Sequence, residues 1–276
     1  EKAFELIVPK QAQQHCCFIV LGSEGRGEQV LKTDQDNALI LEDGFDWPDQ
    51  QQTLQALTET LLQLGYPLCK GSVMVNNPQW VASQSQWQEK VSRWIEHSSA
   101  DTVMQLAIFS DATAIAGNKQ LLPPIMDHLH KSLAGRMLTL SDFVRPALQF
   151  TVPLTLFGQV KTGKEGLDIK QGGIFAIVHG IRTLALEHNI TEKNSFARIE
   201  ALNQLGCLEN ETADNLIESL KLFFKLRLAQ QLTQEQASNN LDLEQLDRTE
   251  RDLLRHSLHV VKKFKQFLAY HYQIRD

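Results

Sequence analysis

Residues 21–42, LGSEGRGEQVLKTDQDNALILE, place a glycine-rich turn and two closely spaced aspartates between two apolar runs. The runs are CCFIVLG (16–22) and NALILE (37–42), and their length and composition predict buried strands. The polar segment EGRGEQVLK (24–32) between them predicts a short helix. A strand, a glycine turn and a second strand preceded by carboxylates indicate a site for an anionic ligand and a metal ion.

The residue types in this stretch suit phosphate and metal binding. Gly22 allows the backbone to approach a triphosphate without a side chain in the way. The Ser23 hydroxyl and the amides of the following turn can hold phosphate oxygens. In an extended strand residues i and i+2 point to the same face, so Asp34 and Asp36 can direct both carboxylates at one point, with Gln35 pointing the other way. Mg²⁺ prefers such oxygen ligands, usually one or two carboxylates with phosphate oxygens and water.

Two other interpretations of the same stretch stay open. The glycines at positions 22, 25 and 27 follow a strand, as in a dinucleotide-binding turn, but their spacing is GxxGxG rather than GxGxxG. The acidic residues also come at the start of the next strand, whereas the acid of a dinucleotide-binding fold lies about 20 residues on, at a strand's end. The other alternative is a plain surface turn with two solvated aspartates, since Gly and Asp are common in turns.

The composition of the 276-residue chain is that of a globular protein with one large or two ordinary domains. Hydrophobic residues make up 42% and charged residues 22%, which is enough apolar material for a core. The formal net charge of -6 argues against a broad nucleic-acid-binding surface, although a nucleotide site needs only local positive charge. Since no apolar run reaches about 18 residues, no membrane span is expected.

The four cysteines, Cys16, Cys17, Cys69 and Cys207, form neither a disulfide framework nor a zinc-binding pattern. Together with the lack of a signal peptide, this predicts a reducing, cytoplasmic location. The chain begins at Glu1 rather than Met, which leads us to expect a segment of a longer protein.

Hydrophobic periodicity divides the chain near its middle. Residues 1–135 mix strand-like runs with helices, whereas residues 136–276 favour helices throughout. The predicted fold class is therefore α+β, with an α/β domain followed by an all-α helical bundle. In the first part, CKGSVMV (69–75) and VMQLAIFSD (103–111) are predicted to form further strands, and the second of these ends at Asp111.

The pattern G-S-x(10)-D-x-D, which begins at Gly22, resembles the signature of the DNA polymerase beta-like nucleotidyltransferase superfamily. The fuller string GSEGRGEQVLKTDQDNALI is similar to the GlnD-like nucleotidyltransferase domain of bacterial signalling proteins. Those proteins also carry CBS and cyclic-nucleotide-binding-like domains, so such domains are expected upstream in the full-length protein. In the second half, LFGQVKTGKEGLDIKQGGIFAIVHGIRTLALEHNI (156–190) resembles the helical substrate-binding domain of that family.

The resemblance implies a reaction and assigns roles to residues. A hydroxyl of a protein or small-molecule acceptor would attack the α-phosphorus of a nucleoside triphosphate (NTP) and release pyrophosphate, as in a reaction of the PII uridylyltransferase kind. Two Mg²⁺ ions would be bound by Asp34 and Asp36, and Asp111 would complete the metal site or act as general base. Arg26 and Lys32 would contact the triphosphate, unless they are solvated surface residues.

One departure from the family pattern favours a second hypothesis. Family members often read Asp-x-Arg at the third carboxylate, whereas this sequence reads Asp111-Ala112-Thr113, so the basic residue is missing. The alternative function is therefore a regulatory module of a signal-transduction protein that binds nucleotide without catalysis. Glu28 is expected to brace Arg26 or the helix start rather than to bind metal.

The segment GQVKTGKE (158–165) has the G-x(4)-G-K spacing of a P-loop, but Glu165 stands where Ser or Thr must bind Mg²⁺. A flexible basic loop is the favoured interpretation, in which Lys161, Lys164 or Lys170 could touch substrate.

Trp80, Trp87 and Trp94 stand seven residues apart, next to and within a predicted helix over residues 83–97. For this stripe, packing in the core is favoured over a docking surface for another domain or subunit.

Overall fold

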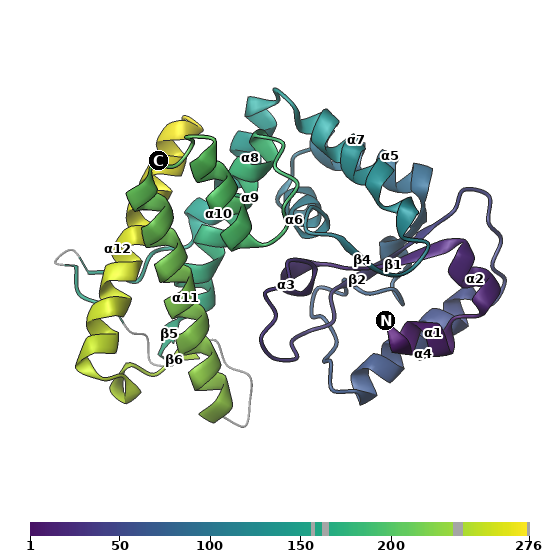
Figure 1. Cartoon of the computed structure of the whole chain (residues 1–276), viewed down its shortest axis with the longest axis horizontal. Coiled ribbons are helices and arrows are strands. Elements are labelled where there is room, and N and C mark those ends of the chain that lie inside the picture. The colour runs from purple at the N-terminus through teal and green to yellow at the C-terminus, as the bar shows by residue number, and fades with distance from the viewer. Residues whose placement is uncertain (156–157, 162–165, 234–239, 275–276) are drawn as a thin grey trace. The chain divides into compact units, whose positions relative to one another are not determined.

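The computed structural model describes residues 1–155, 158–161, 166–233 and 240–274 (Figure 1). The chain forms two compact units, Glu1–Ala134 and Gly135–Asp276. The first contains a four-stranded sheet with helices, and the second is mainly helical. The predicted α+β class, with an α/β part followed by a helical bundle, is confirmed.

The sheet of the first unit consists of short strands in the order β3-β2-β1-β4. The strands are β1 (Cys16–Val20), β2 (Asn37–Leu41), β3 (Val81–Ser83) and β4 (Thr113–Gly117). Strand β1 is antiparallel to both β2 and β4, whereas β3 is parallel to β2. The register pairs Val20 with Asn37 on one side and with Thr113 on the other. The end of β1 therefore lies beside the starts of β2 and β4.

Two of the longer helices of the first unit, α5 (Gln84–Glu96) and α6 (Ala100–Phe109), follow turns whose polar side chains satisfy free backbone amides. The helical segments are α1 (Lys2–Ile7), α2 (Lys10–Gln14), α3 (Gly22–Gly25), α4 (Gln50–Gln63), η1 (Pro78–Trp80), α5 (Gln84–Glu96), α6 (Ala100–Phe109), η2 (Lys119–Leu121) and α7 (Pro123–Leu133). At the start of α5, Ser83 and Gln86 form a capping box, in which each side chain bonds to the other's backbone N–H. Ser99 and Thr102 form the same motif before α6, which fixes where both helices begin.

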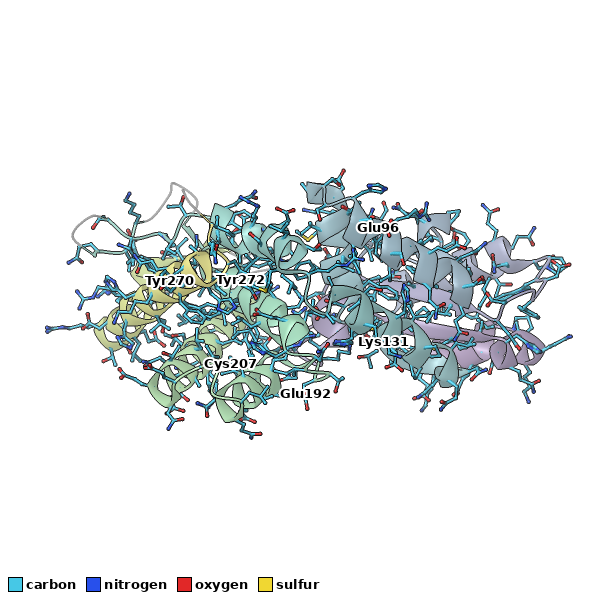
Figure 2. All side chains as sticks on the ribbon, turned by 90° about the horizontal axis from the view of Figure 1, so that it is seen from above. Glu96, Lys131, Glu192, Cys207, Tyr270 and Tyr272 are labelled. Atoms are coloured by element: carbon cyan, nitrogen blue, oxygen red, sulfur yellow. The ribbon has the colours of Figure 1, made fainter. Side chains whose placement is uncertain are left out.

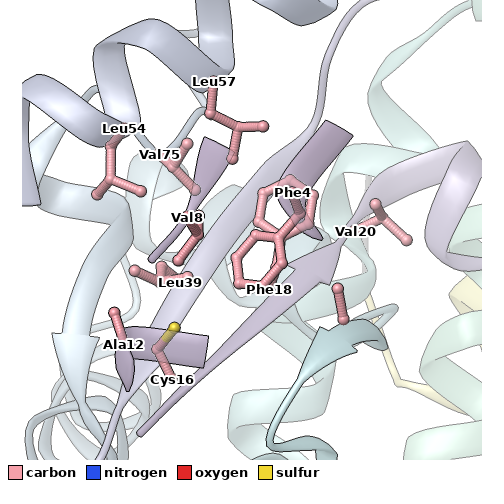
Figure 3. Close-up of a cluster of buried hydrophobic side chains, with 11 residues drawn as sticks. Phe4, Val8, Ala12, Cys16, Phe18, Val20, Leu39, Leu54, Leu57 and Val75 are labelled. Carbon is pink, nitrogen blue, oxygen red and sulfur yellow. The ribbon is translucent and has the colours of Figure 1, made fainter. Parts of the chain in front are cut away.

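One core cluster of the first unit lies between the sheet and helices α1, α2 and α4 (Figure 3). Its buried members are Phe4, Val8, Ala12, Cys16, Phe18, Val20, Leu39, Leu54, Leu57, Val75 and Ala116. Phe4 and Phe18 stack with their ring centroids 5.4 Å apart. The alternate residues Cys17 and Ile19 are also fully buried, so both faces of β1 are covered. This explains why the strand is a continuous apolar run rather than an alternating one.

The three tryptophans pack inside the first unit, which confirms core packing. Trp87 is fully buried, its ring stacks on Phe109 with centroids 4.7 Å apart, and its Nε1 donates to the Leu39 carbonyl oxygen over 3.0 Å. Trp80 and Trp94 both contact the Trp87 ring. Because Trp80 lies in η1 rather than in α5, the three side chains form a cluster and not a stripe on one helix.

The predicted strand over residues 103–111 is wrong, because most of this segment belongs to α6. Val103, Leu106 and Ala107 are buried, and their spacing is that of one helical face. Asp111 consequently lies in the turn between α6 and β4 instead of at the end of a strand.

Two smaller predictions for this unit are also wrong. Residues 69–75 form turns rather than a strand, and Val73 and Val75 are hydrogen-bonded to Asn37 of β2. The Asn37 N–H donates to the Val73 carbonyl oxygen, and the Val75 N–H donates to the Asn37 side chain. The helix predicted after the glycine turn shrinks to the 4 residues of α3, and Gly27 follows it with a positive φ of 66°.

The second unit is arranged around α9. Its elements are α8 (Met137–Gln149), β5 (Leu167–Asp168), η3 (Lys170–Ile174), α9 (Phe175–Glu187), α10 (Ser195–Gln204), α11 (Asn210–Thr233), β6 (Asn240–Leu241), η4 (Leu243–Gln245) and α12 (Arg248–His271). All residues of α9 from 176 to 186 are buried. A Cβ atom on Gly180 would lie 2.5 Å from Cδ1 of Leu268, so this glycine allows α12 to pack closely against α9.

The end of α12 is fastened to the end of α9 through Glu187. The Tyr272 hydroxyl donates to Oε2 of Glu187 over 2.6 Å, and His271 Nε2 lies 2.9 Å from the same carboxylate. Tyr270 is 87% exposed whereas Tyr272 is buried (Figure 2). Burial and the bond to Glu187 both raise the pKa of Tyr272, which keeps its hydroxyl a donor. Among the described residues, no helix combines the length and apolarity needed to cross a membrane.

Replacement of Trp87 tests the packing of the first unit. Trp87→Ala should lower the free energy of unfolding by about 3–5 kcal/mol, because it removes a large buried side chain and leaves a cavity. Trp87→Phe retains a ring beside Phe109 and should cost clearly less. Denaturant unfolding followed by circular dichroism measures both, and a loss below about 1 kcal/mol for the alanine variant would contradict the packing described here.

Candidate functional site

The sheet topology brings three distant segments to one end of β1. Gly22 follows Val20 by two residues, and Asp36 directly precedes Asn37, the β2 partner of Val20. Asp111 precedes Thr113, the β4 partner of Val20, by two residues. The glycine turn and two of the predicted site carboxylates therefore belong to the same end of the sheet.

Gly22 and Asp36 are in direct proximity. The Leu21 N–H donates to the Asp36 carbonyl oxygen over 2.8 Å, which fixes the backbone of the turn against the residue before β2. Gly22 has a φ of 54°, and a Cβ atom there would lie 2.8 Å from Oδ2 of Asp36. The missing side chain thus leaves room for this carboxylate. Ser23, the next residue, is half-buried.

The two aspartates of the DQD sequence flank an inward-pointing glutamine. Gln35 is buried, and its Nε2 donates to the carbonyl oxygens of Thr58 and Tyr66 over 3.2 and 3.0 Å. Asp34 is exposed and Asp36 is half-buried, so the alternation expected of an extended segment is present. Both aspartates lie just before β2 rather than inside it.

Arg26, Glu28 and Asp111 form a buried ionic network. The Arg26 guanidinium donates through Nη1 to Oδ2 of Asp111 over 2.6 Å and through Nε to Oε2 of Glu28 over 2.7 Å. The side chains of Asp111 and Glu28 are 0% and 1% exposed, and that of Arg26 is 10% exposed. Burial alone would lower the pKa of Arg26, but the two carboxylates outweigh it and raise the pKa.

This network answers two sequence expectations. Glu28 braces Arg26, as predicted. Asp111 does have a basic partner although no Arg follows it in the sequence, because Arg26 of the glycine turn pairs with it. Sequence reasoning missed this second contact, since 85 residues separate its partners. The absent Arg after Asp111 was the only available signal that another basic residue was needed.

Gly25 fits the glycine turn tightly to the same region. A Cβ atom on Gly25 would lie 2.3 Å from the Asp111 carbonyl oxygen and 2.8 Å from that of Val20. The Thr113 hydroxyl donates to the Gly25 carbonyl oxygen over 2.7 Å. The turn is therefore closely packed and is held by the Thr113 hydroxyl as well as by the Arg26 network.

The Lys32 side chain contacts the C-terminal end of α4. Its Nζ donates to the Leu64 carbonyl oxygen over 2.7 Å and lies 5.5 Å from the centroid of the Tyr66 ring. Leu64 is the C-cap residue of α4, and a cation is favoured at the negative end of a helix. The exposed Lys32 side chain therefore contacts protein groups in this structure.

Two further side chains belong to the surroundings of Asp36. Burial raises the pKa of Glu24, and the Asp36 carboxylate raises it further. Burial also raises the pKa of Cys69, and a hydrogen bond between its thiol and Asp36 adds to the shift. Glu24 lies within the glycine motif, but no role was predicted for it from the sequence. Cys69 had no sequence signal, since only the fold brings it to Asp36.

These side chains could bind a magnesium ion only together with ligands supplied by substrate phosphates and water. Within the described part of the chain, no group of three or more His, Cys, Asp and Glu side chains is placed to hold a metal ion. Mg²⁺ is usually bound by one or two carboxylates, with substrate phosphates and water as its other ligands. Asp36, whose carboxylate lies against Gly22, and the exposed Asp34 two residues before it could supply such carboxylates.

The P-loop-like segment, residues 158–165, is only partly described by the structure. Residues 162–165, which include Lys164, lie outside the described residues, as do residues 156–157. Lys161 and Lys170 are both exposed in the second unit.

Comparison with protein families assigns both units. Residues 1–101 match the family described as "Putative nucleotidyltransferase DUF294", and residues 137–272 match "Putative nucleotidyltransferase substrate binding domain". The chain belongs to this nucleotidyltransferase family. No curated protein matches the chain in sequence. The nucleotidyltransferase match includes Gly22, Asp34 and Asp36 but ends before Asp111, so the partner of Arg26 lies between the two matched segments.

The ionic network of this nucleotidyltransferase-family chain should be essential for its stability. Arg26→Ala leaves the buried Asp111 and Glu28 carboxylates without their cation, and such a loss costs about 3–5 kcal/mol. The matched control is Lys32→Ala, which removes an exposed cation and should cost less than about 1 kcal/mol. Urea unfolding of the three proteins measures the difference, and equal losses for the two variants would contradict the role of the network.

The contact between Gly22 and Asp36 can be separated from backbone strain by comparison with Gly27. Alanine at either position adopts a positive φ, at a cost of about 1–2 kcal/mol. At Gly27 nothing lies within 4 Å of the added Cβ atom, whereas at Gly22 the Asp36 carboxylate is 2.8 Å away. Gly22→Ala should therefore be the more destabilising in denaturant unfolding. A larger loss for Gly27→Ala would show that Asp36 moves away freely.

Proposed function

We propose that the protein is a metal-dependent nucleotidyltransferase that moves a nucleoside monophosphate from an NTP to a hydroxyl of a protein or small molecule. The observation that carries the proposal is the position of the Asp36 carboxylate over the side-chain-free Gly22. This pair lies within the segment that matches the nucleotidyltransferase family. A turn whose backbone amides could hold phosphate oxygens and a carboxylate that could bind metal are thus adjacent.

The residues of the site would divide the work as follows. Gly22 and Ser23 would accept the phosphates, the hydroxyl of Ser23 donating to a phosphate oxygen. Asp34 and Asp36 would hold Mg²⁺, with two ions as the proposed number. When bound, the metal lowers the pKa of the acceptor hydroxyl and neutralises charge on the departing pyrophosphate. Asp111 would be the third carboxylate of the site.

The cations of the site would act differently from one another. Arg26 is held by two carboxylates, so its contribution would be to keep the glycine turn in position beside Asp111. Lys32 would have to leave the Leu64 carbonyl oxygen to meet a phosphate, which a long exposed side chain can do at small cost.

The proposal also extends to the acceptor of the nucleotide and to the cellular location of the protein. A PII uridylyltransferase-like reaction would make the acceptor a hydroxyl of a signalling protein, and the location would be cytoplasmic. A panel of the four NTPs offered with protein and small-molecule acceptors tests this part separately from nucleotide binding.

The second candidate function is a regulatory module that binds nucleotide without catalysis. It is favoured by the capture of Asp111 Oδ2 by Arg26, since a carboxylate oxygen bound to a guanidinium is not free to bind metal or take a proton. Pyrophosphate release separates the two functions. Binding of Mg²⁺-NTP without release, across the acceptor panel, would favour the regulatory module.

Stabilisation by nucleotide provides the direct test of the site. Mg²⁺-NTP should raise the melting temperature, because a ligand at a hundred times its dissociation constant stabilises the folded state by about 2.7 kcal/mol. The double variant Asp34→Asn and Asp36→Asn should lose the shift. The double variant Asp46→Asn and Asp49→Asn, which changes two exposed aspartates before α4, is the control and should retain it. An unchanged melting temperature of the wild type with all four NTPs would overturn the proposal.

A further inference from the structure

A separate pocket opens on the first unit between α4 and strands β2 and β3. Its volume is about 270 Å³, and its apolar part is formed by Leu54, Val75 and Ala82, which are all buried. Leu54 and Val75 belong to the core cluster of this unit, so the pocket has a firm floor (Figure 3). The residues around its mouth are more open, since Pro78 is exposed.

The polar part of the pocket consists of carboxamides. Four side chains of this type line it: Gln50 and Gln51 from α4, Asn76, and Gln86 from α5. Gln86 accepts from the Ser83 N–H in the capping box of α5. Asn76 Nδ2 donates to Gln55 Oε1 over 3.3 Å. Among the described residues, the half-buried Gln50 and the exposed Gln51 have no side-chain hydrogen-bond partner. None of the lining residues, all of which are described, has an ionisable side chain.

These features define the chemistry of a ligand. Each carboxamide offers both an N–H donor and a carbonyl acceptor in one plane, so it pairs with a group that also presents both. An apolar floor without a counter-charge disfavours an ionised ligand, because burying a charge without a partner is costly. A volume just below the usual range for drug-sized ligands requires a small molecule. Flat heterocycles with alternating donors and acceptors meet all three requirements.

The pocket is distinct from the candidate site. Leu41, at the end of β2, lines the pocket, whereas Asp36 precedes the start of the same strand. At about 3.3 Å per residue, the two ends of β2 are about 13 Å apart. The two places are connected through Val75, which lines the pocket and whose N–H donates to the Asn37 side chain over 2.9 Å.

We propose that this pocket binds a small, uncharged, planar heterocycle of the nucleobase class, with the carboxamides of Gln50 and Gln51 as its hydrogen-bonding partners. The base would lie on the apolar floor and present its donor and acceptor edge to α4. Carboxamides recognise bases in this way by paired hydrogen bonds. The inference concerns a second site and does not depend on nucleotidyl transfer.

The experiment is a titration of the full ¹⁵N-labelled chain with uracil and with adenine, followed through the side-chain NH₂ resonances. The resonances of Gln50 and Gln51 are identified from the alanine variants. At least one base should shift both resonances saturably at millimolar concentration. Toluene, which has the shape without the polar edge, and benzoate, which is planar but charged, should bind at least tenfold more weakly.

Variants separate the pocket from the candidate site. In the double variant Gln50→Ala and Gln51→Ala, binding is followed through the side-chain NH₂ resonances of Asn76 and Gln86, which also line the pocket, and it should be at least tenfold weaker. Gln52→Ala, which changes the next exposed residue of α4, should leave binding unchanged. The double variant Asp34→Asn and Asp36→Asn should also leave it unchanged, which shows that the base is not bound at the NTP site. No saturable shift with either base, or equal binding of toluene, or full binding by the Gln50 and Gln51 double variant, would each overturn the proposal.

Discussion

The buried contact between Arg26 and Asp111 holds the candidate site together. It joins the glycine turn that follows β1 to the turn that precedes β4, while Glu28 binds the other side of the same guanidinium. A buried charge is tolerated only when its hydrogen-bonding capacity is satisfied, and the planar fork of arginine can serve two carboxylates at once. A lysine could not replace this geometry. The shape of the turn therefore depends on one cation placed between two anions.

This arrangement determines the electrostatics at the end of the sheet. The two carboxylates around Arg26 more than neutralise it, and Glu24, Asp34 and Asp36 add further acidic groups nearby. A triphosphate approaching such a surface meets repulsion unless a divalent cation accompanies it. In the proposed function, metal dependence is thus a consequence of the local charge as well as of the chemistry of transfer.

Local patterns in the sequence predicted local structure well, and long-range contacts were beyond them. The apolar runs 16–22 and 37–42 were predicted as strands and contain β1 and β2, and contact with Arg26 was one of the two roles predicted for Glu28. Residues 103–111 were predicted incorrectly because a short apolar run fits either period, and the cap that decides for a helix lies upstream of it. The partnership of Arg26 with Asp111 is a property of the strand order alone.

The placement of β4 late in the first unit has a consequence for the biosynthesis of the protein. The glycine turn leaves the ribosome well before Asp111 has been translated, because 85 residues separate Arg26 from its partner. Until β4 pairs with β1, the turn has no Thr113 hydroxyl and no Asp111 carboxylate to hold it. Contacts between such distant residues form late in folding. A truncated chain that ends before β4 would carry the complete G-S-x(10)-D-x-D motif and still lack the two contacts that hold its glycine turn in place.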